Sequence, residues 1–315
     1  MDRTAQTGSR TDWVLFGLLG LLWGSSFLFI KVGVETLPPF TLVTLRLIFA
    51  TAFLTLVVAL TREGLPRSLT TYRHLAVLGV LSIVVPFSLI AWGEQRIDSG
   101  LAAILDSTVP LFAIVISGLV LHDEPVRANR VAGLLVGFAG VAMVMSRSLG
   151  SAGSSTEGEL AVVVAAGSYA LGAIYARRYL RGLRPMMTAL GQIVLALLVT
   201  TPIAFIAEQP LEVSLRPEAL FAVAWLGVLG LGVAYLIYYR LINNWGATRA
   251  SMVTYLLPIV GVTLGVAFLG ESVDLPIITG IALVIIGVAL ASVSSHDSFS
   301  ERRSRLGRRL RLRRR

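Results

Sequence analysis

The feature that most constrains this chain is a series of ten apolar runs, each long enough to cross a lipid bilayer as an α-helix. About 18 consecutive apolar residues span the hydrocarbon core, and a helix satisfies its own backbone groups, for which lipid offers no partner. Only 14% of the residues are charged, and most of them lie in short clusters between the runs. The sequence therefore predicts an all-α integral membrane protein with ten transmembrane helices. The predicted helices span residues 13–31, 39–61, 73–93, 98–121, 128–146, 159–180, 185–207, 218–240, 246–269 and 275–294.

Composition argues against a soluble protein. Hydrophobic residues make up 55% of the chain and the mean hydropathy is +0.79. A soluble helical protein would need amphipathic faces, which these runs lack. The first run is long for a signal-peptide core and no small-x-small cleavage site follows it, so we interpret it as an uncleaved span. The chain has no cysteine, which excludes disulfides and thiolate metal sites and fits a bacterial inner-membrane protein.

Short polar stretches divide the chain into five predicted segments. These are a cytoplasmic N-terminus (1–12), a first five-helix repeat (13–146), an external Ser/Gly-rich linker (147–158), a second five-helix repeat (159–294) and a basic cytoplasmic tail (295–315). Ten spans place both termini on one side of the membrane. Basic residues remain cytoplasmic in membrane proteins, and thirteen of them precede the tail on the side of the termini, against four on the other side. Both termini are therefore expected to face the cytoplasm.

The basic tail contains nine arginines between Arg302 and Arg315, and the chain as a whole has a formal net charge of +9. We interpret the tail as a topology anchor. It could also bind anionic lipid, or nucleic acid without specificity, and we expect no specific nucleic-acid partner.

The two halves of the chain resemble each other. A shift of 146 residues aligns Trp23 with Tyr169 and Arg46 with Gln192, and nearby shifts align further prolines and glycines. Each half holds five spans, an odd number, so the second half must enter the membrane inverted relative to the first. Inverted repeats are typical of secondary transporters, in which one half moves against the other and exposes a central site to each side in turn.

The ordered motifs of the two halves resemble the EamA-like branch of the drug/metabolite transporter superfamily. This resemblance covers about residues 13 to 294. It implies a ten-helix transporter of small metabolites or drugs, often an exporter, and leaves the substrate open. Asp106 departs from the pattern, because the family more often has a small or neutral polar residue there. The motif residues are Trp23, Gly24, Ser25, Ser26, Phe27, Lys31, Arg46, Ala50, Pro110, Asp123 and Glu124 in the first half, and Ala250, Ser251, Pro258, Gly270, Glu271, Gly280 and Gly287 in the second.

Two charged residues fall inside predicted spans, Arg46 in the second and Asp106 in the fourth. A charge in a span is costly and marks a functional residue by default. At about 1.5 Å per residue, both lie roughly 10–12 Å below the outer surface. In the functional interpretation Arg46 attracts a carboxylate, and Asp106 holds a substrate amine or a coupling proton. In the structural alternatives the two residues pair with each other, or Arg46 extends to the interface.

Prolines predict matching helix interruptions in the two halves. Pro110 and Pro258 each leave the carbonyl four residues earlier without its helical donor, and these carbonyls belong to Asp106 and Thr254. Paired interruptions indicate a central binding site, although a simple kink is the alternative. The second-half counterparts of the charged pair are Gln192 and Thr254, which we include among the candidate substrate-binding residues.

Three further residues complete the candidate site. Trp23 and Ser26 lie on the first helix, where a small hydroxyl could line a cavity or permit close packing. Tyr255 could stack on a solute, although tyrosines in membrane proteins more often pack or lie at the interface.

These observations predict a secondary transporter, acting as an exporter, of small metabolites such as amino acids or related amines. The alternatives are a multidrug or organic-cation efflux permease and, from another class, a lipid flippase or non-transporting receptor. We expect no enzyme, because the three histidines fall at span ends or in the tail and no hydrolytic or metal site can be assembled. No cofactor is expected, proton coupling is open, and a monomer suffices although a dimer could form.

Overall fold

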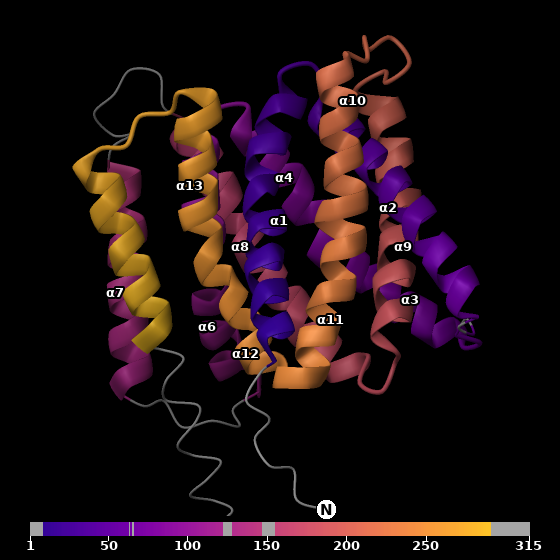
Figure 1. Cartoon of the computed structure of the whole chain (residues 1–315), viewed down its shortest axis with the longest axis horizontal. Coiled ribbons are helices and arrows are strands. Elements are labelled where there is room, and N and C mark those ends of the chain that lie inside the picture. Colours follow the sequence, from indigo (N-terminus) through magenta and orange to yellow (C-terminus); the bar gives the residue numbers. More distant parts are fainter. Residues whose placement is uncertain (1–8, 63, 65, 122–127, 147–154, 291–315) are drawn as a thin grey trace, which may run out of the picture.

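The computed structural model describes residues 9–62, 64, 66–121, 128–146 and 155–290. The predicted tail (295–315), most of the linker and the Asp123–Glu124 motif lie outside these residues. In the first half, helices run alternately up and down the bundle (Figure 1). They are α1 (Arg10–Val34), α2 (Pro39–Thr61), the continuous unit α3–η1–α4 (Leu69–Gly79, Val80–Val84, Val85–Glu94), the interrupted unit α5–α6 (Ser99–Asp106, Val109–Leu121) and α7 (Ala128–Ser146).

The second half repeats this order. Its helices are α8 (Thr156–Tyr179), α9 (Pro185–Ala207), the unit α10–η2–α11 (Pro217–Ala224, Trp225–Val233, Ala234–Trp245), the unit α12–η3–α13 (Ala247–Ser251, Met252–Tyr255, Leu256–Leu269) and a final helix, Leu275–Leu290. Eight of the described helices are long and apolar enough to cross a membrane, and Val131–Ser146 and Leu275–Leu290 are shorter apolar helices. This confirms the predicted all-α membrane fold of ten transmembrane helices.

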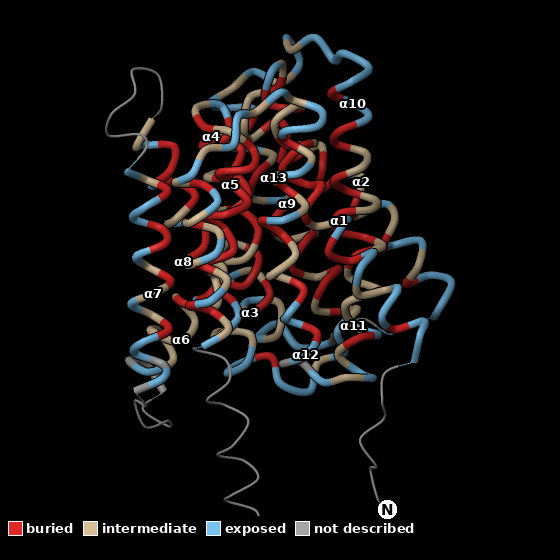
Figure 2. The backbone as a smooth tube through the Cα atoms, turned by 60° about the vertical axis from the view of Figure 1, so that its left-hand side comes forward, coloured by how far each residue is buried: buried red, intermediate tan, exposed pale blue. Residues whose placement is uncertain are grey.

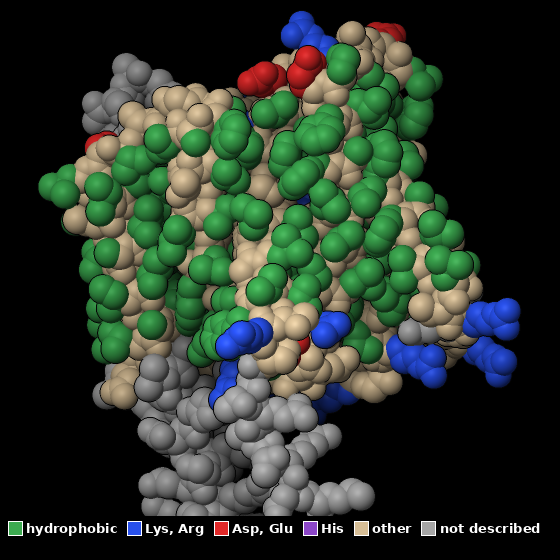
Figure 3. Space-filling view, in the orientation of Figure 1, with side chains coloured by type: hydrophobic (Ala, Val, Ile, Leu, Met, Phe, Trp, Pro, Cys, Tyr) green, Lys and Arg blue, Asp and Glu red, His purple; other side chains and the backbone are tan. Residues whose placement is uncertain are grey.

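The outside of the bundle suits lipid rather than water. Large hydrophobic side chains such as Leu60, Leu198 and Ile206 are exposed on it. Figure 3 shows hydrophobic side chains over the middle of the visible face, with most Lys and Arg side chains at the lower end. In a bilayer these apolar side chains face lipid tails, which explains why their exposure is tolerated.

Buried residues gather in the middle of the bundle (Figure 2), and both halves contribute to this core. The main pairs of packed helices each join one half to the other: α1 with α13, α2 with α9, and α4 with α8. α7 and the final helix form a separate pair, in which a Cβ added at Gly287 would fall on the backbone of Gly137. Glycine is needed here because the two backbones approach closely. Because α1–α13, α2–α9 and α4–α8 each join the two halves, motion of one half against the other would rearrange the side chains packed between them.

Local irregularities recur at equivalent places in the two halves. The third helix of each half contains a π-helical segment, Val80–Val84 and Trp225–Val233, and a shift of 146 residues places the first within the second. A residue with left-handed backbone follows the second helix of each half: Arg62 (φ 52°) comes directly after α2, and Gln209 (φ 48°) comes two residues after the end of α9. Segments of π-helix are often found at functional sites, so their pairing directs attention to the region between α4 and α11.

Candidate functional site

Arg46 lies in the first half of α2 and is buried, with 5% of its surface exposed. α2 begins at Pro39, whose fixed φ suits the first helical position, and this start places Arg46 two turns into the bundle. The guanidinium carbon lies 3.9 Å from the centroid of the Phe87 ring on α4, a cation–π geometry. The Nε–H group has no hydrogen-bond partner among the described groups. Arg46 is therefore held from one side by an aromatic face while a donor remains free.

Polar side chains from three other helices surround this arginine. Tyr169 on α8, Tyr235 on α11 and Glu94 on α4 lie close enough to act on its charge. Gln192 on α9 faces the Tyr235 hydroxyl, and its Oε1 atom has no partner within the described structure. Arg46 and its repeat counterpart Gln192 thus lie in one polar interior, because α2 packs directly on α9.

Asp106 is the last residue of α5 and is 9% exposed. The helix is interrupted directly after it, where the Ser107 and Thr108 hydroxyls donate to the carbonyls of Ile104 and Leu105, both at 2.6 Å. These bonds satisfy both hydroxyls locally, whereas the Asp106 Oδ1 atom has no partner among the described groups. Pro110, in the first turn of α6, cannot donate a backbone hydrogen bond, which accounts for the interruption.

Arg46 and Asp106 do not form a pair in this structure. Within the residues that the structure describes, no ion pair joins them, and the acidic side chain that acts on the Arg46 charge is Glu94. Asp106 lies in the same interior, in the neighbourhood of Tyr169. Of the alternatives for these residues, neither a direct ion pair nor extension of Arg46 to the interface agrees with this geometry.

Sequence reasoning missed Glu94, the last residue of α4. It is fully buried, and neither carboxylate oxygen has a hydrogen-bond partner in the described part of the chain. The predicted third span ended at residue 93, so this acid was treated as part of a loop. The available signal was its position two helical turns after Phe87, on the same face of the helix.

Trp23 and Ser26 have mainly packing contacts. The Trp23 Nε1–H donates to the Gly230 carbonyl at 3.2 Å, and its ring lies 5.2 Å from that of Tyr238. The Ser26 hydroxyl donates to the carbonyl of Leu22 at 3.1 Å. Trp23 thus holds α1 against η2, Ser26 bonds within α1, and the polar groups of both side chains are already used.

Thr254 and Tyr255 lie in η3, the irregular turn before α13, at the lower end of the bundle (Figure 1). The Thr254 hydroxyl donates to the Ser251 carbonyl at 2.9 Å, and Tyr255 packs against the main core. Pro258 is buried in the first turn of α13. The second half therefore has an interruption like that at Asp106, but its hydroxyl is satisfied locally.

At the upper end, two carboxylates of the second half accept hydrogen bonds from the N-terminal ends of two helices of the first half. Glu271 accepts hydrogen bonds from the Ser99 and Gly100 N–H groups of α5, at 2.7 and 2.9 Å. Glu208 accepts bonds from the start of α2, at 2.7 Å from the Thr41 N–H group. Such charge-assisted bonds at a helix N-terminus are strong and oppose separation of the halves.

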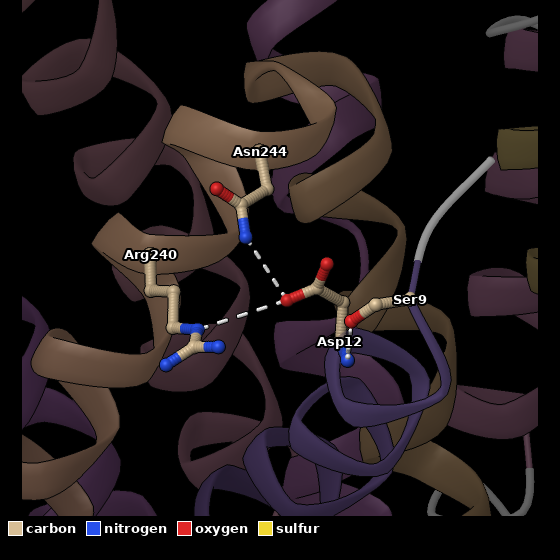
Figure 4. A network of polar contacts seen from close by, with 4 residues as sticks. All are labelled: Ser9, Asp12, Arg240 and Asn244. Atoms are coloured by element: carbon tan, nitrogen blue, oxygen red, sulfur yellow. Dashed lines mark hydrogen bonds and ion pairs between the residues drawn. The ribbon is translucent and has the colours of Figure 1, made fainter. Parts of the chain in front are cut away.

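Asp12, near the start of α1, joins the two halves at the lower end of the bundle (Figure 4). Its Oδ1 atom accepts a hydrogen bond from Asn244 at 3.0 Å and lies 3.7 Å from Arg240 Nε, both on α11. Polar contacts thus join the two halves at both ends of the bundle. A buried interior with a cation, two carboxylates, an amide and phenols has the chemistry to bind a small charged solute away from lipid.

Comparison with known proteins gives one family for nearly the whole chain. The model of the EamA-like transporter family matches residues 11–146 and, a second time, residues 156–293. The transporter YedA of the Escherichia coli inner membrane, described as uncharacterized, is 27% identical over 90% of this chain and 92% of its own. The Bacillus subtilis transporter YoaV, also described as uncharacterized, is 24% identical over 87% and 95%.

A solved crystal structure shares the fold, with a TM-score of 0.65 at 19% identity over 91% of this chain and 98% of that one. The double family match, the curated relatives and the ten-helix fold agree with one another. The chain is a multi-pass membrane transporter and belongs to the EamA-like transporter family.

Proposed function

We propose that this protein is a secondary transporter of small metabolites that carry a carboxylate and an amine, such as amino acids or related amines. It moves them by alternating access around the polar interior between its halves. The observation that carries the proposal is the free Nε–H donor of Arg46, buried in the same interior as the free Oδ1 acceptor of Asp106. Buried polar groups are normally satisfied, so a pair of free groups of opposite charge suits a solute that bonds to both.

The chemistry of each side chain fits one part of such a solute. The planar guanidinium of Arg46 suits a carboxylate, to which it can donate two parallel bonds. Asp106 suits an ammonium group. Tyr169 and Tyr235 flank Arg46 and supply aromatic faces and hydroxyls for the remainder of the solute. Gln192 offers an amide from the opposite half, so that one solute would contact both repeats.

The proposed orientation places both termini in the cytoplasm of a bacterial cell, with the upper end of the bundle outside. The Lys and Arg side chains at the lower end support this choice. Glu208 and Glu271 then close the outer end, and Asp12 with Asn244 closes the inner end. In export, the solute enters from the cytoplasm when the Asp12 contacts at the inner end open. It leaves to the outside when the Glu208 and Glu271 contacts at the outer end open.

An untargeted comparison of extracellular small molecules tests this function. Cells that overproduce the wild-type protein are compared with cells producing Arg46→Ala, and with a control variant, Arg216→Ala, at the exposed start of α10. The proposal expects one class of compounds to accumulate outside with the wild type and the control only. Equal accumulation with Arg46→Ala, at equal amounts of protein in the membrane, would contradict it.

Efflux of organic cations is a second candidate, favoured by the two buried acids Glu94 and Asp106 and by the tyrosines around them. In that case Asp106→Asn abolishes resistance to cationic compounds while Arg46→Ala retains it. Growth assays of both variants on a panel of organic cations distinguish this function from metabolite export.

A further inference from the structure

A side chain on the first helix of each half donates a hydrogen bond to the π-helical segment of the opposite half. The Ser168 hydroxyl on α8 donates to the Leu81 carbonyl in η1 at 2.7 Å. The Trp23 Nε1–H group on α1 donates to the Gly230 carbonyl in η2 at 3.2 Å. Ser168 directly precedes Tyr169, the repeat counterpart of Trp23. The two bonds are therefore corresponding contacts in the two halves, although one donor is a hydroxyl and the other an indole.

Each third helix also touches the second helix of the opposite half, beside a residue of the candidate site. A Cβ added at Gly227, inside η2, would fall on the carbonyl oxygen of Arg46. A Cβ added at Gly79, directly before η1, would fall on the carbonyl oxygen of Gln192, the counterpart of Arg46. Small residues at these two places allow the close approach. Each π segment is thus held between two helices of the other half, one that carries a site residue and one that supplies a donor.

The bond made by Ser168 is not the one that a helical serine usually makes. Hydroxyls in helices commonly bond to a carbonyl three or four residues earlier, as the Ser117 hydroxyl does with Ile114 at 3.1 Å. Ser168 is 7% exposed and donates instead to a carbonyl of the opposite half. A carbonyl has two lone pairs, and side chains that insert into the helical ladder accompany irregular turns. Because π turns are rare in helices, a donor that reaches one favours the turn where it stands.

The two π segments lie directly before residues of the candidate site. Phe87, which lies 3.9 Å from the Arg46 guanidinium carbon, follows the end of η1 by three residues. Tyr235 follows the end of η2 by two residues. Where the wider turn falls decides which of the side chains that follow it point into the interior. The direction of Phe87, and with it the support of Arg46, thus depends on a turn that Ser168 of the other half contacts.

We infer that Ser168 and Trp23 are positioning residues of the site, each acting across the interface between the halves. Ser168 fixes η1 so that Phe87 supports Arg46, and Trp23 fixes η2 and so places Tyr235. The geometry around Arg46 is therefore complete only while the first helix of the second half is docked on the third helix of the first half. The consequence for transport rests on the proposed function, whereas the geometry can be tested without a solute.

Nuclear magnetic resonance of the purified full-length protein in detergent micelles makes this test. In protein with isotope-labelled arginine nitrogens, the buried Arg46 Nε–H group exchanges slowly with water, and its signal is identified by its loss in Arg46→Lys. The ring current of Phe87 displaces this signal, and Phe87→Leu shows its position without the ring. Ser168→Ala is expected to move the signal toward the Phe87→Leu position. Ser168→Thr, which keeps the hydroxyl, should leave it near the wild-type position.

Ser117→Ala is the matched control, because it removes a hydroxyl that bonds only within its own helix. This variant should leave the Arg46 signal unchanged. A signal that stays in place in Ser168→Ala, or that moves equally in Ser117→Ala, would overturn the inference. Because no solute is present, a failure to transport the proposed solutes would count against the proposed function alone.

The second half supplies its own test. Trp23→Phe removes the indole N–H group but keeps an aromatic ring. It should move the ring signals of Tyr235, which are identified by their loss in Tyr235→Phe. Tyr235 signals that do not move would overturn the inference for η2.

Discussion

The guanidinium carbon of Arg46 lies 3.9 Å above the ring of Phe87, and this contact joins α2 to α4 inside the bundle. The ring holds the cation without consuming any of its N–H donors. An arginine held by a carboxylate would have lost the donors that a solute carboxylate needs. The contact with Phe87 therefore allows Arg46 to be buried while its N–H donors stay available to a solute carboxylate.

Replacing this support should weaken binding more than folding. In Phe87→Leu the apolar volume is largely kept while the cation–π contact, worth about 1–2 kcal/mol at a buried site, is lost. We expect the apparent affinity for the solute to fall about tenfold. The measurement is solute uptake into liposomes over a range of concentrations. Phe112→Leu, at a ring that packs on Phe138, is the matched control and should leave affinity unchanged.

The geometry of Arg46 should matter as well as its charge. Arg46→Ala is expected to insert normally and to abolish transport, and Arg46→Lys to retain less than about a tenth of it. Lysine keeps the charge but cannot donate two parallel bonds or stack as a planar group. Transport is measured at equal membrane content of each variant. Wild-type rates for Arg46→Lys would mean that a point charge is sufficient and that no bidentate contact is formed.

The cap formed by Glu271 should contribute to stability at the upper end. Glu271→Gln keeps the shape but removes the charge that favours the N-terminal end of α5. We expect a loss of about 1–2 kcal/mol, because the hydrogen bonds are then no longer charge-assisted. Thermal unfolding in detergent measures it. Glu212→Gln, an exposed residue in the loop before α10, should be neutral, and equal behaviour of the two variants would contradict the role of the cap.

Weakening the contacts at the lower end and at the upper end should have opposite effects on how easily a reagent reaches the interior from the lower end. The chain has no cysteine, so Thr254→Cys gives a single reactive thiol at the lower end. Adding Asp12→Asn weakens the contact with Asn244 and should raise the rate of modification by a maleimide applied at that end. Adding Glu271→Gln should lower that rate, because it favours opening at the upper end. Changes of the same sign in both would argue against alternating access.

Much of the fold was predictable because individual residues, prolines above all, mark where helices begin. Pro39 and Pro185 mark the first residues of α2 and α9, and the predicted bounds of both helices agree with the structure. A proline is tolerated at this position since its missing N–H would be unsatisfied in any case. Hydropathy predicted the remaining helices. The repeated pattern predicted that the two halves are equivalent.

The site was predictable in part. Counting residues along a span gives the depth of Arg46 and Asp106 but not the direction in which each side chain points. Packing of α2 against α4 and α9 decides that direction, and it places Arg46 over Phe87 rather than against Asp106. Glu94 was missed for a related reason, because a charge near a span end is usually solvated. Here the Lys31 ammonium and the start of α5 cover that end.

The paired π-helical segments have a consequence for how the bundle can move. A π segment contains one residue more than an α-helix of the same length, so the stripes of side chains before and after it are rotated relative to each other. Phe87 and Glu94 follow the first segment and Tyr235 follows the second. If the extra residue migrates along the helix by a few positions, the side chains it passes rotate while the ends of the helix stay in place. Each half would then possess its own means of turning site residues toward or away from a solute, without tilting the whole span.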